Sequence, residues 1–147
     1  MAKINVISHR GANMVAPQNT LPAFKKSFEI GCDGVETDIH LTKDGVPVLC
    51  HNFTIDETST GTGAIKDMTL EELLQFDFGL YKSEEYKDTK IPLLEDFIKL
   101  CKENNITPII MTMPPLVGDR WFENVTKNLN KENIAKFLGE NPGDKLS

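Results

Sequence analysis

Residues 34–52 read GVETDIHLTKDGVPVLCHN, and the segment 34–41 alternates between two kinds of side chain. Successive side chains of a β-strand point to opposite faces, so this alternation predicts a strand with one apolar and one polar face. The two sets are Val35, Thr37 and Ile39 on one face and Glu36, Asp38 and His40 on the other. Both carboxylates are therefore expected to point the same way.

A second strand is predicted directly after this one. Lys43, Asp44 and Gly45 have the composition of a hairpin-type turn, and the run 46–50 that follows is mostly apolar. His51 is therefore expected at the end of a strand.

Polar residues also follow the first apolar run of the chain. Residues 4–8 predict a short strand, and His9, Arg10 and Gly11 come at its end. Polar clusters at successive strand ends are typical of an active site built on an α/β sheet. Two carboxylates could hold a divalent cation, two imidazoles could move protons, and a guanidinium could bind a phosphate. This combination predicts metal-assisted phosphoryl chemistry.

Each of these groups also has a plainer interpretation. A histidine at a strand end or an arginine beside it can be an ordinary surface residue, and Glu36 and Asp38 could lie on a solvated strand face. Carboxylates two positions apart in a barrel interior would repel each other without a cation, which favours the functional interpretation.

The remaining pattern predicts helices between strands. Thr20 precedes a helix over 21–30 that Gly31 ends, and Thr69 and Glu72 form a capping box before a short helix to about residue 76. Further elements are expected as an amphipathic helix over 93–103, a β-branched strand over 106–113, and one or two helices over 121–138. We therefore expect one α/β domain over residues 1–147, with a mostly parallel open sheet of three to four βα units.

Composition narrows the functional classes. The 147 residues carry a formal net charge of −6, which argues against nucleic acid as a partner. No signal peptide or membrane span is expected, because no apolar run approaches the necessary length. Three widely spaced cysteines fit reduced, buried thiols in a cytoplasmic protein.

Four segments resemble the glycerophosphodiester phosphodiesterase family over about residues 4–105. They are HRGANMVAPQNTLPAF (9–24), GVETDIHLTKDGVPVLCHN (34–52), MTLEELLQFDFG (68–79) and IPLLEDF (91–97). The resemblance implies a TIM-barrel fold, of which this chain is expected to form a partial TIM-barrel-like, mostly parallel open sheet. It also implies the activity of a lipid-metabolism hydrolase that converts a small-molecule phosphodiester into an alcohol and glycerol phosphate. It assigns acid–base catalysis to His9 and His51, phosphate contact to Arg10, and Ca²⁺ or Mg²⁺ binding to Glu36 and Asp38.

The chain departs from the pattern of that family at several positions. Gln18 stands where glutamate is usual, Asn52 where aspartate is usual, and Glu57 where arginine is common. The strand over 106–113 has no carboxylate, although the family places its third metal ligand there. Met111 or its neighbour Thr112 is the equivalent position. We therefore expect weak cation binding and reduced activity, and a catalytically inactive remnant that binds a metal or phosphate, or another protein, is the alternative.

The last part of the chain resembles a different family. Residues 107–140 are similar to an internal segment of GDSL-type (SGNH) esterases, without the motifs that carry their catalytic residues. We interpret 106–147 as an atypical βα unit, and the chain as a fusion or deletion product. An open sheet would leave an unpaired edge, through which two copies could form a homodimer.

Overall fold

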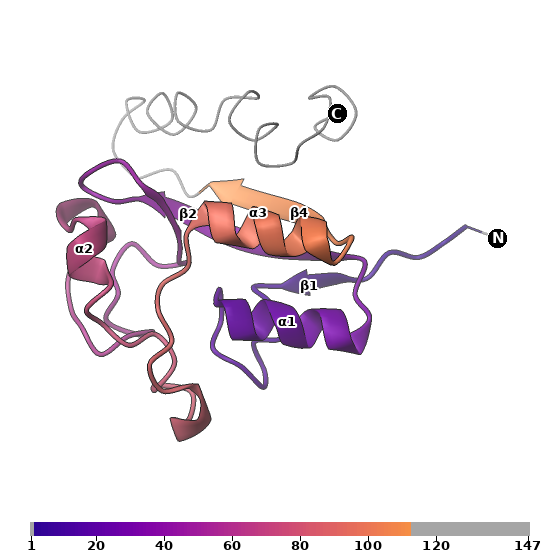
Figure 1. Ribbon diagram of the computed structural model, residues 1–147, viewed down its shortest axis with the longest axis horizontal. Coiled ribbons are helices and arrows are strands. Elements are labelled where there is room, and N and C mark those ends of the chain that lie inside the picture. Colours follow the sequence, from indigo (N-terminus) through magenta and orange to yellow (C-terminus); the bar gives the residue numbers. More distant parts are fainter. Residues whose placement is uncertain (1, 113–147) are drawn as a thin grey trace.

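The computed structural model describes residues 2–112, which form one α/β unit (Figure 1). Its strands and helices in chain order are β1 (Ile7–His9), α1 (Leu21–Ile30), β2 (Gly34–Leu41), β3 (Pro47–Leu49), the 3₁₀ turn η1 (Ile65–Asp67), α2 (Leu70–Leu73), the 3₁₀ turn η2 (Glu84–Tyr86), α3 (Leu94–Glu103) and β4 (Thr107–Thr112). The predicted bounds of α1 and β2 are confirmed.

Strand β2 is the centre of a mostly parallel sheet. Along one edge, β2 pairs with β4 in parallel orientation. Along its other edge, β2 pairs first with β1 in parallel orientation and then with β3 in antiparallel orientation. The β1 register joins His9 to Glu36, whereas the β3 register begins at Ile39 opposite Leu49. Strands β1 and β3 therefore occupy successive stretches of the same edge. The predicted open, mostly parallel α/β sheet is confirmed.

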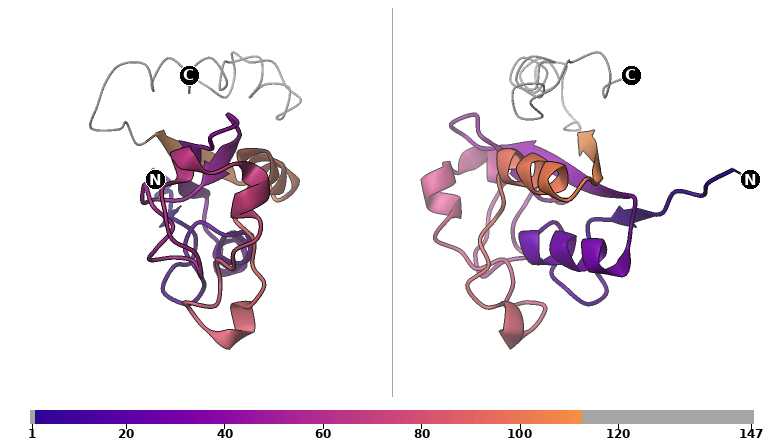
Figure 2. Two further views of the ribbon diagram at one scale, coloured as in Figure 1. Left: turned by 90° about the vertical axis from the view of Figure 1, so that its left-hand side faces the viewer. Right: turned by 45° about the vertical axis from the view of Figure 1, so that its right-hand side comes forward.

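Helices α1 and α3 pack on the apolar face of this sheet. Phe24 of α1 and Phe97 of α3 are fully buried with ring centroids 4.7 Å apart, and both belong to one cluster with Val35 and Ile39 of β2. The two helices run alongside the strands in Figure 1 and in the right-hand view of Figure 2. Because one face of β2 forms this core, its alternate side chains, which include Glu36, must face the other way.

A second apolar cluster lies under the long segment between β3 and α3, which extends away from the sheet (Figure 2). The capping box of Thr69 and Glu72 opens α2 as predicted, but the helix ends at Leu73 rather than near residue 76. The bonds from Gln75 to Glu72 and from Phe76 to Leu73 join residues three apart, so the last turn tightens out of α-helical geometry.

The first strand differs from its prediction. It covers Ile7–His9 rather than residues 4–8, and Ile4 and Val6 are 85% and 57% exposed. The backbone N–H of Val6 donates to the Asp33 carboxylate at 2.9 Å, while the Val6 carbonyl accepts from the backbone N–H groups of Asp33 and Gly34. Only the carbonyl of Val6 therefore reaches the first residue of β2. Apolar character alone placed the strand too early.

Other predicted elements differ little or fall outside the described part. Strand β3 is one residue shorter at each end than 46–50, β4 begins one residue later than 106, and Thr20 precedes α1 without a side-chain capping bond. The predicted helices over 121–138 lie outside the described residues. Within residues 2–112, no helix has the length and apolar character needed to cross a membrane. Association of two copies through a sheet edge stays a prediction.

Gly11 offers a test of how the loop after β1 is held. Its φ is 76°, and a Cβ there would lie 2.7 Å from the Cβ of Ala23 in α1. Gly45 has a similar φ of 79° but no atom within 4 Å of such a Cβ. We expect Gly45→Ala to lower the free energy of unfolding by about 1–2 kcal/mol through backbone strain. Gly11→Ala should cost at least about 1 kcal/mol more because of overpacking. Equal losses in urea denaturation would contradict this close approach.

Candidate active site

The polar face of β2 brings four of the five predicted site residues together, and these are His9, Arg10, Glu36 and Asp38. His9 pairs with Glu36 at the end of β1, and the backbone N–H of Cys50 donates to the carbonyl of Asp38. Glu36 and Asp38, the β2 residues that these two contacts reach, are two positions apart, roughly 7 Å along the strand. His9 and the residue before His51 therefore reach the same edge of the sheet.

Glu36 lies beside His9 on the polar face of β2. Its Oε2 lies 3.7 Å from Nε2 of His9, and this oxygen is buried without a hydrogen-bond partner among the described residues. Burial raises the pKa of Glu36, and the neighbouring Asp38 carboxylate raises it further, while His9 acts in the opposite direction. A buried carboxylate oxygen that lacks a donor is costly unless a ligand or cation contacts it.

Arg10 crosses from the loop after β1 to the second acid. Its Nε lies 3.4 Å from Oδ2 of Asp38, and its Nη1 donates to Oε1 of Gln18 at 3.1 Å. The Nε atom is buried and makes no hydrogen bond within the described chain. Gln18 therefore keeps a hydrogen bond to the guanidinium but adds no negative charge.

Asn19 is a site residue that the sequence analysis missed. It is 2% exposed, its Nδ2 donates to Oδ2 of Asp38 at 3.2 Å, and its Oδ1 accepts from the Thr37 hydroxyl at 2.8 Å. Its backbone has a φ of 55°, a conformation that asparagine tolerates better than most residues. An asparagine directly before the N-cap Thr20, in a loop that follows a polar strand end, was the available signal.

His51 is held by its neighbours rather than by the carboxylates. Its backbone carbonyl contacts Nε2 of His40 at 2.9 Å, and its Nδ1 lies 2.8 Å from Oδ1 of Asn52. Burial lowers the pKa of His40, which also packs edge-on against Phe53. A neutral His40 that donates to this carbonyl has a structural role.

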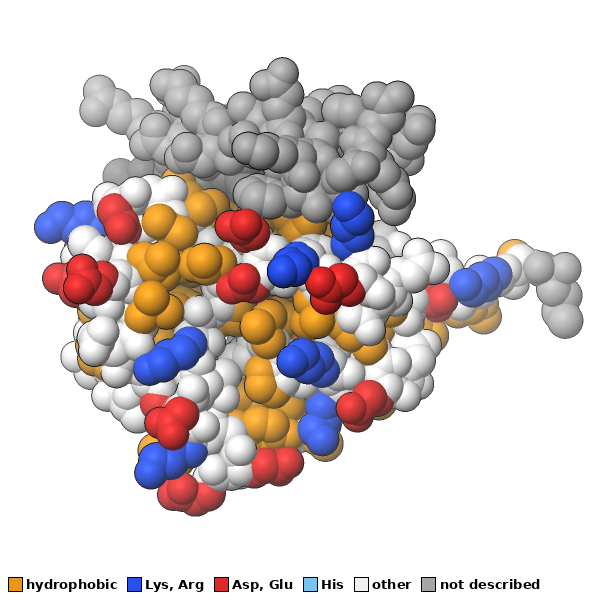
Figure 3. Space-filling view, viewed as in Figure 1, with side chains coloured by type: hydrophobic (Ala, Val, Ile, Leu, Met, Phe, Trp, Pro, Cys, Tyr) orange, Lys and Arg blue, Asp and Glu red, His pale blue; other side chains and the backbone are white. Residues whose placement is uncertain are grey.

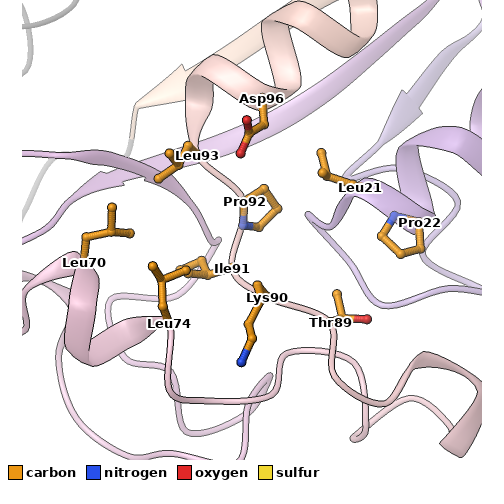
Figure 4. Close-up of a pocket in the computed structure, with 10 residues that line it drawn as sticks. All are labelled: Leu21, Pro22, Leu70, Leu74, Thr89, Lys90, Ile91, Pro92, Leu93 and Asp96. Carbon is orange, nitrogen blue, oxygen red and sulfur yellow. The ribbon is translucent and has the colours of Figure 1, made fainter.

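Two cavities among the described residues differ in their relation to the candidate site. His51 lines a small cavity of about 10 Å³ together with Gln18 and Asn19, which bond to Arg10 and Asp38 respectively. A larger hollow of about 240 Å³ lies between the start of α1, α2 and the segment before α3 (Figure 4). Its lining is mostly apolar, on a face where hydrophobic side chains reach the surface (Figure 3), and it includes no histidine. The larger hollow therefore contains none of the predicted site residues.

The acids of β2 could supply two ligands to a hard cation. The unpartnered Glu36 oxygen and the Asp38 carboxylate beside it are the donor type that Ca²⁺ and Mg²⁺ prefer. Among residues 2–112, however, no cluster of three or more histidine, cysteine, aspartate or glutamate side chains is arranged to hold a metal ion. In the β4 register, Ile109 stands opposite Glu36 and Met111 opposite Asp38. Strand β4 thus adds no third carboxylate.

Two curated proteins of known name are similar to most of the described part of this chain. A glycerophosphodiester phosphodiesterase of Caldanaerobacter subterraneus is 44% identical over 103 residues, which cover 70% of this chain and 42% of the relative. Human glycerophosphodiester phosphodiesterase 1 is 38% identical over 107 residues, 71% of this chain and 32% of the human protein. The chain thus spans less than half the length of these relatives.

Solved structures match at the level of the fold. A glycerophosphodiester phosphodiesterase from Agrobacterium tumefaciens has a TM-score of 0.72 at 30% identity, over 75% of this chain and 47% of that one. A phosphodiesterase from Oleispira antarctica, in complex with the product sn-glycerol-3-phosphate, has a TM-score of 0.77 at 28% identity, over 93% and 52% of the two chains. The described strands therefore correspond to part of a TIM barrel.

A family model decides the relationship. Residues 9–138 match the glycerophosphoryl diester phosphodiesterase family, a range that continues through most of the segment predicted to resemble GDSL-type esterases. That second resemblance is not supported. From the family match and the relatives together, the chain belongs to the glycerophosphoryl diester phosphodiesterase family.

Proposed function

We propose that this chain hydrolyses a glycerophosphodiester to an alcohol and glycerol phosphate, with Ca²⁺ or Mg²⁺ held by Glu36 and Asp38. The observation that carries the proposal is a pair of unsatisfied buried atoms, Nε of Arg10 and Oε2 of Glu36, within one cluster. A buried donor on a cation suits an anionic phosphate oxygen, and a buried acceptor on a carboxylate suits a metal ion. A phosphodiester with a divalent cation satisfies both at once.

Arg10 has the charge that the reaction demands. A phosphodiester anion repels nucleophiles, and negative charge on its oxygens must be stabilised as the transition state forms. The Arg10 guanidinium forms an ion pair with Asp38 and donates a hydrogen bond to Gln18, so its position is set before a substrate binds. A bound divalent cation would supply Lewis-acid stabilisation of the same oxygens.

The two imidazoles supply proton transfer from different surroundings. The His9 side chain is 65% exposed, so it can exchange protons with water between turnovers. His51 is partly buried and is fixed through its backbone and its ring. One accepts a proton from the attacking water while the other donates one to the departing alcohol oxygen.

Hydrolysis can be tested directly with glycerophosphoethanolamine and ³¹P NMR detection of glycerol phosphate, in the presence of Ca²⁺ or Mg²⁺. We expect turnover by the wild-type chain, and a loss of about 10²–10⁴-fold in kcat for His9→Asn or His51→Asn. Glu85→Ala, an exposed acid on η2, serves as the matched control and should keep wild-type activity. A correctly folded wild type without turnover would favour the inactive, ligand-binding remnant.

The coupling between the two acids gives a second prediction. Burial is the first cause of the raised pKa of Glu36 and the Asp38 charge the second, so Asp38→Asn should lower that pKa without returning it to the ordinary value. Carboxyl ¹³C NMR titration in the absence of divalent cations measures it. Asp44→Asn removes an exposed charge at the hairpin turn and should leave Glu36 unchanged. An identical Glu36 pKa in wild type and Asp38→Asn would contradict the coupling between Glu36 and Asp38.

Because a proton on Glu36 competes with a cation, cation binding should weaken as the pH falls toward the pKa of Glu36.

The missing ligand gives a third prediction. Because Met111 stands opposite Asp38, Met111→Glu should put a carboxylate on the same face as the acids. An added charge about 4 Å from the cation contributes on the order of 1–4 kcal/mol, so the Kd for Ca²⁺ or Mg²⁺ should fall by roughly tenfold or more.

Isothermal titration calorimetry measures this Kd, and two further variants make the comparison decisive. Glutamine has nearly the same size as glutamate but no charge, so Met111→Gln should strengthen cation binding little. Position 112 is paired with Ile39 of the core face, so Thr112→Glu should not strengthen binding. Low-micromolar affinity in wild type, or equal strengthening by Thr112→Glu, would overturn the assignment of the missing ligand to position 111.

A further inference from the structure

A short hydrogen-bonded chain runs from His51 to a surface carboxylate. Nδ1 of His51 lies 2.8 Å from Oδ1 of Asn52, and Nδ2 of Asn52 donates to Oε2 of Glu57 at 2.7 Å. An ionised carboxylate only accepts hydrogen bonds, so the amide nitrogen of Asn52 must be the atom that faces Glu57. The amide oxygen then faces His51 and only accepts, so Nδ1 of His51 carries a hydrogen. In the neutral ring, Nε2 is therefore the unprotonated nitrogen.

The backbone holds the three residues in this order. The loop after β3 is closed by the bridge between Thr54 and Ala64, and the fully buried Ile55 anchors it between Asn52 and Glu57. His40 fixes the other side of His51 through the backbone carbonyl. Neither residue of the Asn52–Glu57 pair depends on a long-range contact to find the other, because they are five positions apart on one closed loop.

We propose that Glu57 is a positioning residue that acts through Asn52 to keep His51 protonated on Nδ1, with Nε2 free to exchange the proton of the reaction. The proposal rests on the acid–base role of His51 in the proposed function. An asparagine alone is ambiguous, because its amide can turn and offer either the oxygen or the NH₂ group to the ring. With the NH₂ group turned inward, the hydrogen would move to Nε2 and block the lone pair. The Glu57 carboxylate removes that ambiguity.

The tautomer can be measured without activity. The chain has three histidines, so ¹⁵N-labelled full-length protein at about pH 8, where ordinary histidines are neutral, gives few ring signals to assign. In wild type we expect a pyrrole-type Nδ1 and a pyridine-type Nε2 for His51. In Glu57→Ala the two amide orientations become similar in energy, and the Nδ1–H population should fall from nearly all to about half. The control Glu85→Ala should keep the wild-type spectrum.

Kinetics and a rescue variant separate positioning from mere support of the loop. Glu57→Ala should lower kcat at least about twofold with KM unchanged, in step with the lost tautomer. Asn52→Asp/Glu57→Gln places at position 52 a carboxylate, which only accepts hydrogen bonds, and at position 57 an amide that donates to it. We therefore expect the double variant to restore the Nδ1–H form and to raise kcat above that of the Glu57→Ala variant.

The results that overturn the proposal differ from those that overturn the proposed function. A wild-type His51 protonated on Nε2, or a full Nδ1–H population in Glu57→Ala, removes the role of Glu57. An altered melting temperature with an unchanged tautomer assigns Glu57 to loop stability alone and also rejects the proposal. A chain with the expected tautomers but no turnover rejects the proposed function, while the role of Glu57 as the group that orients Asn52 stands.

Discussion

The two faces of strand β2 impose the constraint on which the rest of the structure depends. One face is packed by Phe24 and Phe97 and cannot turn, because a shift by one residue would bring Glu36 and Asp38 into the apolar core. The carboxylates are thereby held on the opposite face at the cost of mutual repulsion, which helps to raise the pKa of Glu36. Packing energy on one side of the strand thus maintains an unfavourable concentration of charge on the other.

The described residues satisfy the two carboxylates only in part. Arg10 and Asn19 both contact Asp38, whereas among these residues the Oε2 atom of Glu36 has a 3.7 Å contact to His9 and no hydrogen bond. A fully satisfied polar cluster would be a stable structural feature with little affinity for anything else. In an incompletely satisfied one, a suitable ligand supplies the missing partners, and this is why the cluster carries the proposed function.

The four departures from the family pattern have different structural consequences. Gln18 still accepts a hydrogen bond from Arg10, so only a charge is lost there. Asn52 and Glu57 contact each other, so these two departures form one local arrangement next to His51. The apolar stretch of β4 has no such compensation within the described residues, since Ile109 and Met111 stand opposite the two acids.

The sequence by itself determined the elements whose signals are local. Alternation in 34–41 predicted β2 and the common direction of Glu36 and Asp38, and helical spacing with Gly31 predicted α1, because these periodicities follow from the covalent geometry of strands and helices. Only the tertiary structure decided which groups meet across the chain. The backbone N–H of Val6 bonds to the Asp33 side chain, Asn19 reaches Asp38 from nineteen positions away, and the β4 register puts Met111 rather than Thr112 opposite Asp38. Such contacts depend on how separate elements pack, and hydrogen bonds between distant segments leave no periodic trace in the sequence.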